Sequence, residues 1–75
     1  MKSEQSSDEL KKLSDIAADL GLLAELRTKA TELLGNIGTH EALLALLDLA
    51  GNERLPVHER ELALKKARDI IKSGH

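Results

Sequence analysis

A helix that ends at one glycine and is followed at once by a second helix places the strongest constraint on this fold. Residues 27–49 read RTKATELLGNIGTHEALLALLDL, with one amphipathic helical pattern up to Gly38 and another from Thr39 onward. Glycine ends helices readily because it tolerates a left-handed backbone, and threonine is a favoured N-cap. Two helices joined by so short a corner form an αα unit, whose apolar faces need further helices to pack against.

Helical periodicity extends over most of the chain. Apolar residues recur three and four positions apart in four segments, as expected of one buried face on each helix. The predicted helices occupy residues 7–20, 22–37, 40–50 and 56–72. Gly21 fits the end of the first helix and Pro56 the first turn of the last. We therefore expect a single all-α domain over residues 7–75, after a disordered segment at residues 1–6.

The second predicted helix carries a long apolar stripe. The residues of this stripe are Leu22, Leu23, Leu26, Ala30, Leu33, Leu34 and Ile37. They lie on one narrow arc of the helix, so we expect this stripe to be buried.

Composition excludes several kinds of site. The 75 residues contain no cysteine, Phe, Tyr or Trp, so disulfides and thiolate metal sites are excluded and the core must be aliphatic. The formal net charge is −2 with both signs interleaved, which is typical of a solvated surface. No apolar run approaches the roughly 18 residues that span a bilayer, and the N-terminus lacks a signal-peptide core. We therefore expect a cytoplasmic protein with no membrane contact.

An internal repeat becomes visible when the chain is shifted against itself by 33 residues. The matching pairs are Leu10/Leu43, Leu13/Leu46, Asp15/Asp48, Ala17/Ala50, Leu22/Leu55, Arg27/Arg60, Ala30/Ala63 and Ile37/Ile70. Two helices in a period of this length are typical of an α-solenoid. The repeats are predicted at residues 7–38 and 39–73.

The residues at the junction of the two repeats resemble HEAT repeats, in the short bacterial form also called PBS-lyase-type HEAT. The resemblance is carried by Leu26-Arg27, Ala30, Leu34-Gly35, Ile37-Gly38, Glu41-Ala42-Leu43 and Leu46. It implies a right-handed αα-superhelix of two helical hairpins and a role in binding other macromolecules. A plain four-helix bundle and an armadillo-like arrangement are the structural alternatives.

Three short motifs resemble functional sites. His40-Glu41 and His58-Glu59 each begin like the zinc-protease pattern HExxH, but a leucine stands at the position of the second histidine. Residues 35–38 have the GxxG spacing of a nucleic-acid clamp without its basic setting, and a helix end explains these glycines better. We therefore predict no catalytic, metal or cofactor-binding residue and no enzymatic activity.

A basic patch is predicted near the end of the last helix. It consists of Lys65, Lys66, Arg68 and Lys72. Such a patch could contact a phosphate backbone, which makes a nucleic-acid-binding repeat domain the alternative function. Acidic residues lie on the same helix and no aromatic residue can stack on a base, so complementation of the helix dipole is favoured.

Excess apolar residues on the third predicted helix provide the leading functional hypothesis. Apolar residues cover more than half of its circumference, and Leu44, Leu47 and Leu62 are predicted at an interface. Such a surface could dock another protein, another repeat or a second copy in a homodimer. We expect a protein–protein interaction or scaffold module, which the chain could supply to a larger regulatory or sensor protein. A lyase-associated role is a third hypothesis, suggested by the repeat's name alone.

Overall fold

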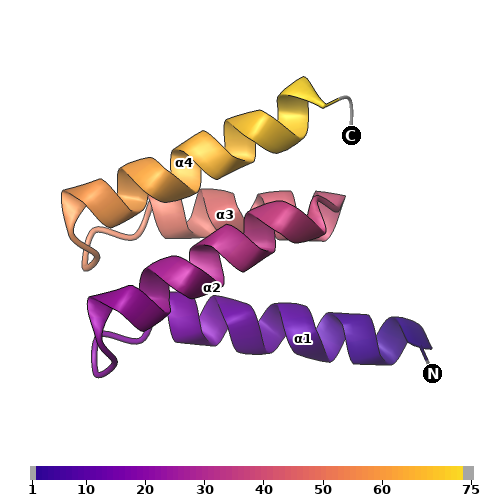
Figure 1. Cartoon of the computed structure of the whole chain (residues 1–75), viewed down its shortest axis with the longest axis horizontal. Coiled ribbons are helices and arrows are strands. Elements are labelled where there is room, and N and C mark those ends of the chain that lie inside the picture. The colour runs from indigo at the N-terminus through magenta and orange to yellow at the C-terminus, as the bar shows by residue number, and fades with distance from the viewer. Residues whose placement is uncertain (1, 74–75) are drawn as a thin grey trace.

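The structure, a computed structural model of the chain, describes the backbone of residues 2–73 and the side chains of residues 8–73. Four helices account for most of it (Figure 1): α1 (Lys2–Ala17), α2 (Ala24–Ile37), α3 (His40–Ala50) and α4 (Val57–Lys72). The described residues form no strand, so the all-α prediction is confirmed. None of these helices has the length and hydropathy needed to cross a membrane.

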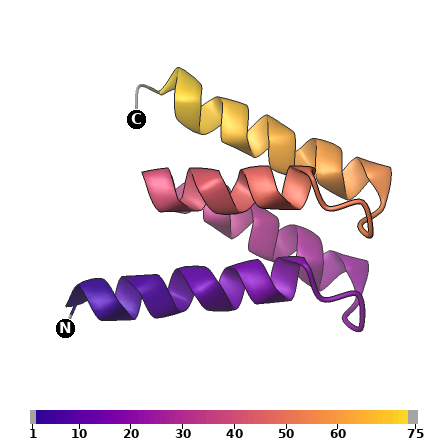
Figure 2. The same cartoon turned by 180° about the vertical axis from the view of Figure 1, so that it is seen from behind.

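The four helices form two hairpins that lie side by side. Helix α1 runs parallel to α3 in one layer, and α2 runs parallel to α4 in the other (Figures 1 and 2). The inner helices, α2 and α3, each contact all the others, whereas α1 and α4 do not contact each other within the described residues. A simple up-and-down bundle pairs antiparallel neighbours instead. Each hairpin therefore keeps one face with no hairpin against it.

Helix α1 begins earlier and ends earlier than predicted. It already includes Lys2, so most of the segment predicted to be disordered is helical, and Met1 lies outside the described residues. No glycine or proline interrupts this segment, and its Lys, Glu and Gln are good helix formers. The helix ends at Ala17, and Gly21 lies in the following turn with an ordinary negative φ instead of acting as a left-handed helix end.

The corner between α2 and α3 has the predicted structure. Gly38 adopts a left-handed φ of 69°, and its N–H donates to the Leu34 carbonyl at 3.4 Å. The Thr39 hydroxyl accepts a hydrogen bond from the Ala42 N–H at 3.1 Å, which caps α3. Because helix ends leave backbone groups unpaired, these two bonds satisfy the corner without a longer loop.

The core is formed by residues from all four helices and the loop before α4. Its residues are aliphatic and buried: Leu10, Ala17, Ala30, Leu34, Ala42, Leu43, Leu46, Leu49, Leu55, Ala63, Ala67 and Ile70. Leu34 and Leu46 are the largest fully buried side chains. The many alanines let helix backbones approach closely, which is how a core without aromatic residues is filled.

The predicted burial of the stripe on the second helix is wrong for four of its seven residues. Leu23, Leu26, Leu33 and Ile37 are exposed, whereas Ala30 and Leu34 are buried. The neighbours of α2 lie to one side of the predicted stripe, so its buried side includes Arg27 and Thr31 instead.

The loops at residues 18–23 and 51–56 show that the 33-residue repeat is structural. In each loop a side-chain oxygen, from Asp19 or Asn52, accepts a hydrogen bond from the N–H two residues later, at 2.8 and 3.0 Å. Three backbone hydrogen bonds of the first loop also recur 33 residues later in the second. In the first loop, Leu22 N donates to Asp19 O, and Leu26 N and Arg27 N donate to Leu23 O. In the second loop, Leu55 N donates to Asn52 O, and Glu59 N and Arg60 N donate to Pro56 O. The two hairpins thus turn in the same way.

Candidate protein interface

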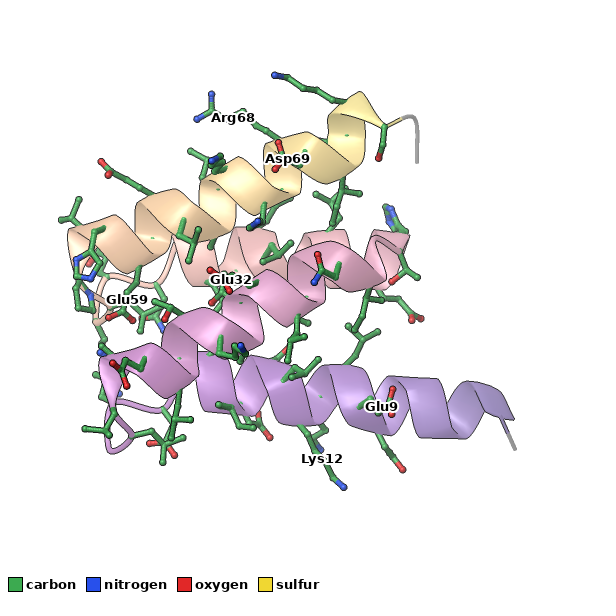
Figure 3. All side chains as sticks on the ribbon, in the orientation of Figure 1. Glu9, Lys12, Glu32, Glu59, Arg68 and Asp69 are labelled. Atoms are coloured by element: carbon green, nitrogen blue, oxygen red, sulfur yellow. The ribbon has the colours of Figure 1, made fainter. Side chains whose placement is uncertain are left out.

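A buried ion pair joins the two hairpins. The Arg27 Nε and Nη2 donate to the Glu59 Oε1 and Oε2, both at 2.8 Å, in a bidentate pair. The third nitrogen, Nη1, donates to the Leu22 carbonyl at 2.6 Å. Both residues are buried, and Glu59 lies between the first turns of α4 and α2 (Figure 3). The Arg27 guanidinium therefore links the loop before α2 to the second hairpin.

The ion pair stabilises the charged forms of both groups. The hydrogen bonds from Arg27 hold the pKa of the Glu59 carboxyl below its usual range, although burial acts in the opposite direction. The same bonds raise the pKa of Arg27. Taking two charges out of water is costly, so this pair is stable because its geometry is bidentate and its remaining donor is also bonded.

No sequence pattern predicted this pair. The interleaved charges were expected to form a solvated surface, which is wrong for the buried Glu59. One signal was available: Arg27, Ala30 and Leu34 lie three and four residues apart, which places an arginine on the same helix face as two core residues. The repeat match between Arg27 and Arg60 was a second signal.

Arg60 is the counterpart of Arg27 in the second hairpin. Its Nε donates to the Leu55 carbonyl at 3.1 Å, and Leu55 is the counterpart of Leu22. Arg60 is half-buried. Among the side chains of residues 8–73, no carboxylate lies within ion-pairing distance of it. The second hairpin therefore has the same loop anchor, made by Nε instead of Nη1, but no described equivalent of Glu59 against it.

Five exposed aliphatic side chains lie on the two helices of the second hairpin, and we call them the second-hairpin face. They are Leu44 and Leu47 of α3 and Val57, Leu64 and Ile71 of α4, with exposed fractions of 49%, 42%, 57%, 41% and 57%. The three α4 residues are spaced by seven, so they share one side of that helix.

The repeat register shows which way the α3 part of this face points. Lys11 and Ser14 of α1 line a shallow groove against α3, together with Glu41 and Ala45. The α3 residues 33 positions later are Leu44 and Leu47. They therefore lie on the side of α3 opposite to α1, where a third hairpin would pack.

Leu62 does not belong to this face. It is half-buried and lies one turn from Glu59 and Lys66, the residues that contact α2. Leu62 was predicted at the same interface as Leu44 and Leu47, and the structure places it elsewhere. The position of α2 on one side of α4 is what distinguishes Leu62 from Leu44 and Leu47, and this position cannot be seen in the sequence.

The predicted basic patch is divided between two sides of α4. The Lys66 side chain lies over Gly35, close enough that a Cβ there would stand 3.0 Å from its Cδ. Lys65, Arg68 and Lys72 are exposed, and Arg68 points away from the other helices (Figure 3). Exposed Glu61 and Asp69 lie on the same helix, so the surface has mixed charge.

The two His-Glu motifs lie on different helices. His40 and His58 are exposed in the first turns of α3 and α4. The His58 Nε2 lies 3.8 Å from the Glu59 Oε2, but that carboxylate is already engaged by Arg27. In the part of the chain that the structure describes, no three metal-binding side chains gather.

The first hairpin has an apolar surface of its own, the first-hairpin face, made of Leu26, Leu33 and Ile37. The counterparts of these residues on α4 are Glu59, Lys66 and Ile70, which lie against α2 or in the core. A shallow groove of about 470 Å³ lies beside it, lined by Glu9, Lys12, Leu13, Leu33, Asn36 and Ile37.

No protein-family model, curated protein or solved structure matches this chain. The features that bear on function are the two apolar faces, the arginine beside one of them, and the repeat that relates them.

Proposed function

We propose that this chain is a protein–protein interaction module, built as a short HEAT-like stack of two hairpins. The observation that carries the proposal is the second-hairpin face, where five aliphatic side chains are each at least two-fifths exposed on adjacent helices. Scattered exposed leucines are common on soluble proteins, but a continuous apolar patch on packed helices is typical of an interaction surface.

The repeat indicates how this patch would bind a partner. Side chains at the corresponding places of the first hairpin contact the second hairpin: Arg27 binds Glu59, and Lys11 and Ser14 line a groove against α3. Solenoid proteins bury such faces by stacking one unit on the next. The proposed module would bind a partner through the same kind of contact, with the partner in the place of the next hairpin.

Affinity capture with a matched control tests this function. The bait carries Leu44→Lys with Leu64→Lys, which adds two charges to the second-hairpin face. The control carries Leu20→Lys with Leu23→Lys, at comparably exposed positions in the loop of the first hairpin. A partner captured from source-cell extract, then purified, should bind wild type and control alike and bind the face variant at least about tenfold more weakly.

Two outcomes would contradict the proposal. Equal binding by the face variant and the control would show that the patch is not the interface. DNA binding whose affinity falls with salt, with a slope of several charges, would favour the nucleic-acid alternative instead. Circular dichroism of every variant checks that helicity is retained.

A further inference from the structure

We propose that the second-hairpin face binds a helix of a different protein, and that a glutamate in the first turn of that helix pairs with Arg60. This inference deepens the proposed function by stating the chemistry of the partner. It rests on the proposed function in one respect, namely that the second-hairpin face is an interface.

The contact between the hairpins is the template. There, a glutamate in the first turn of α4 binds the arginine of the preceding hairpin through two hydrogen bonds of 2.8 Å. Four residues later, Ala63 is fully buried, so α4 lies close to its neighbours. The minimal recognition element of this contact is therefore a helix with glutamate in its first turn and a small residue four positions further on.

Arg60 is placed to receive the same element. Its Nε is held by the Leu55 carbonyl, so the side chain is already partly ordered. Arg27 instead binds the Leu22 carbonyl through Nη1 and the carboxylate through Nε and Nη2, so Arg60 would offer a carboxylate its two Nη groups. Both Nη groups have no acceptor among the described residues. A carboxylate that arrives with an apolar helix would pair with them beside Val57 and Leu64, which lie one turn away on α4, and such bonds are strong once water is displaced.

A second copy of this chain does not supply that carboxylate. The face it would offer in a head-to-tail stack is the first-hairpin face, in which Leu26 stands at the position of Glu59. A two-fold dimer through the second-hairpin face would set a side of α4 with two cations, Arg60 and Arg68, and one carboxylate, Glu61, against its own copy, so cations would be in excess. The charge of this face therefore favours a different, acidic partner.

A further position on the second-hairpin face limits the size of one side chain of the partner helix. At the contact between the hairpins, Lys66 crosses Gly35, which has no side chain to obstruct it. On the second-hairpin face the counterpart of Gly35 is Arg68, which carries a long side chain. A partner helix should therefore have a small residue, not a lysine or leucine, seven positions after its glutamate.

A variant of the chain itself can serve as the probe. The probe carries Leu26→Glu, Leu33→Ala and Arg60→Gln, so its first-hairpin face presents the glutamate and the small residue but its own Arg60 site is removed. The control probe carries Leu26→Gln in place of Leu26→Glu and is otherwise identical. Leu26 and Leu33 are exposed, so both probes should keep the fold, which circular dichroism verifies.

Binding of each probe to labelled wild-type chain is measured by fluorescence anisotropy. The glutamate probe should bind at least about tenfold more tightly than the glutamine probe, and this difference should disappear when the labelled chain carries Arg60→Gln. Equal affinity of the two probes for wild type, a difference that persists without Arg60, or no binding by either probe would overturn the proposal.

This result can be separated from the test of the proposed function. If the natural partner is lost by the Leu44→Lys, Leu64→Lys variant but retained by Arg60→Gln, the interface stands and the glutamate-bearing helix is wrong. If neither variant affects the natural partner, the function itself is wrong.

Discussion

Arg27 and Arg60 occupy the same position in the two hairpins, yet their surroundings differ. Both donate to the carbonyl of the leucine five residues earlier. Arg27 also binds a buried carboxylate of the next hairpin, whereas Arg60 lies beside exposed aliphatic side chains. The difference shows that the local sequence fixes how the arginine is anchored, and that a neighbouring hairpin decides whether it becomes part of an interior.

The largest difference should appear between two adjacent leucines of α3. Leu46 is fully buried and Leu47 is 42% exposed. Replacing Leu46 with Ala leaves a cavity and should lower the free energy of unfolding by about 2–5 kcal/mol, whereas Leu47→Ala should cost less than about 1 kcal/mol. Urea denaturation measures both. Similar losses would mean that Leu47 is buried in solution, as in a dimer.

The two arginines themselves should respond unequally. Arg27→Met leaves Glu59 buried without a cation, and we expect the melting temperature to fall by about 10 °C or more. Arg60→Met, the matched control, should change it by only a few degrees, because no described carboxylate depends on it. Adding Glu59→Leu to Arg27→Met should restore most of the loss. A large effect of Arg60→Met would contradict the comparison.

Lowering the pH should remove the contribution of the Arg27–Glu59 pair to stability. Arg27 lowers the pKa of Glu59, so the stability from this carboxylate is present above the pKa of an unpaired glutamate, about 4.3, and is lost as the pH falls through the lower folded pKa. Urea midpoints from pH 6 to pH 2 should therefore fall less steeply for Glu59→Gln than for wild type. In Arg27→Met, burial alone would raise the pKa of Glu59, so its contribution should reverse sign. Parallel profiles for all three proteins would contradict this prediction.

The smallest expected effect concerns the corner that joins the hairpins. Gly38 has a φ of 69°, which alanine adopts only with strain, so Gly38→Ala should lower the free energy of unfolding by about 1 kcal/mol. Gly51 follows α3 with a φ of −91°, and a Cβ there would make ordinary contacts. Gly51→Ala should therefore be close to neutral. Equal effects in thermal denaturation would show that backbone strain at the corner is unimportant.

Sequence patterns predicted the candidate interface in part. Leu44 and Leu47 were singled out because α3 has more apolar residues than one buried face needs, and the structure shows both exposed on one side. Val57, Leu64 and Ile71 all belong to the apolar stripe of the helix predicted at residues 56–72, which gave no indication that they would be exposed. Periodicity identifies residues that share a side of a helix, but it does not say whether another helix covers that side.

The sequence by itself determined the local structure. The corner at Gly38 and Thr39, the bounds of α3 and the 33-residue repeat follow from backbone preferences and capping chemistry, which act over a few residues. Only the tertiary structure decided which equivalent positions became interior. Leu26 and Glu59 occupy the same place in the two hairpins, and the charged residue is the buried one because α4 packs on Arg27. Burial depends on the neighbour, and the neighbour is set by packing across the whole chain.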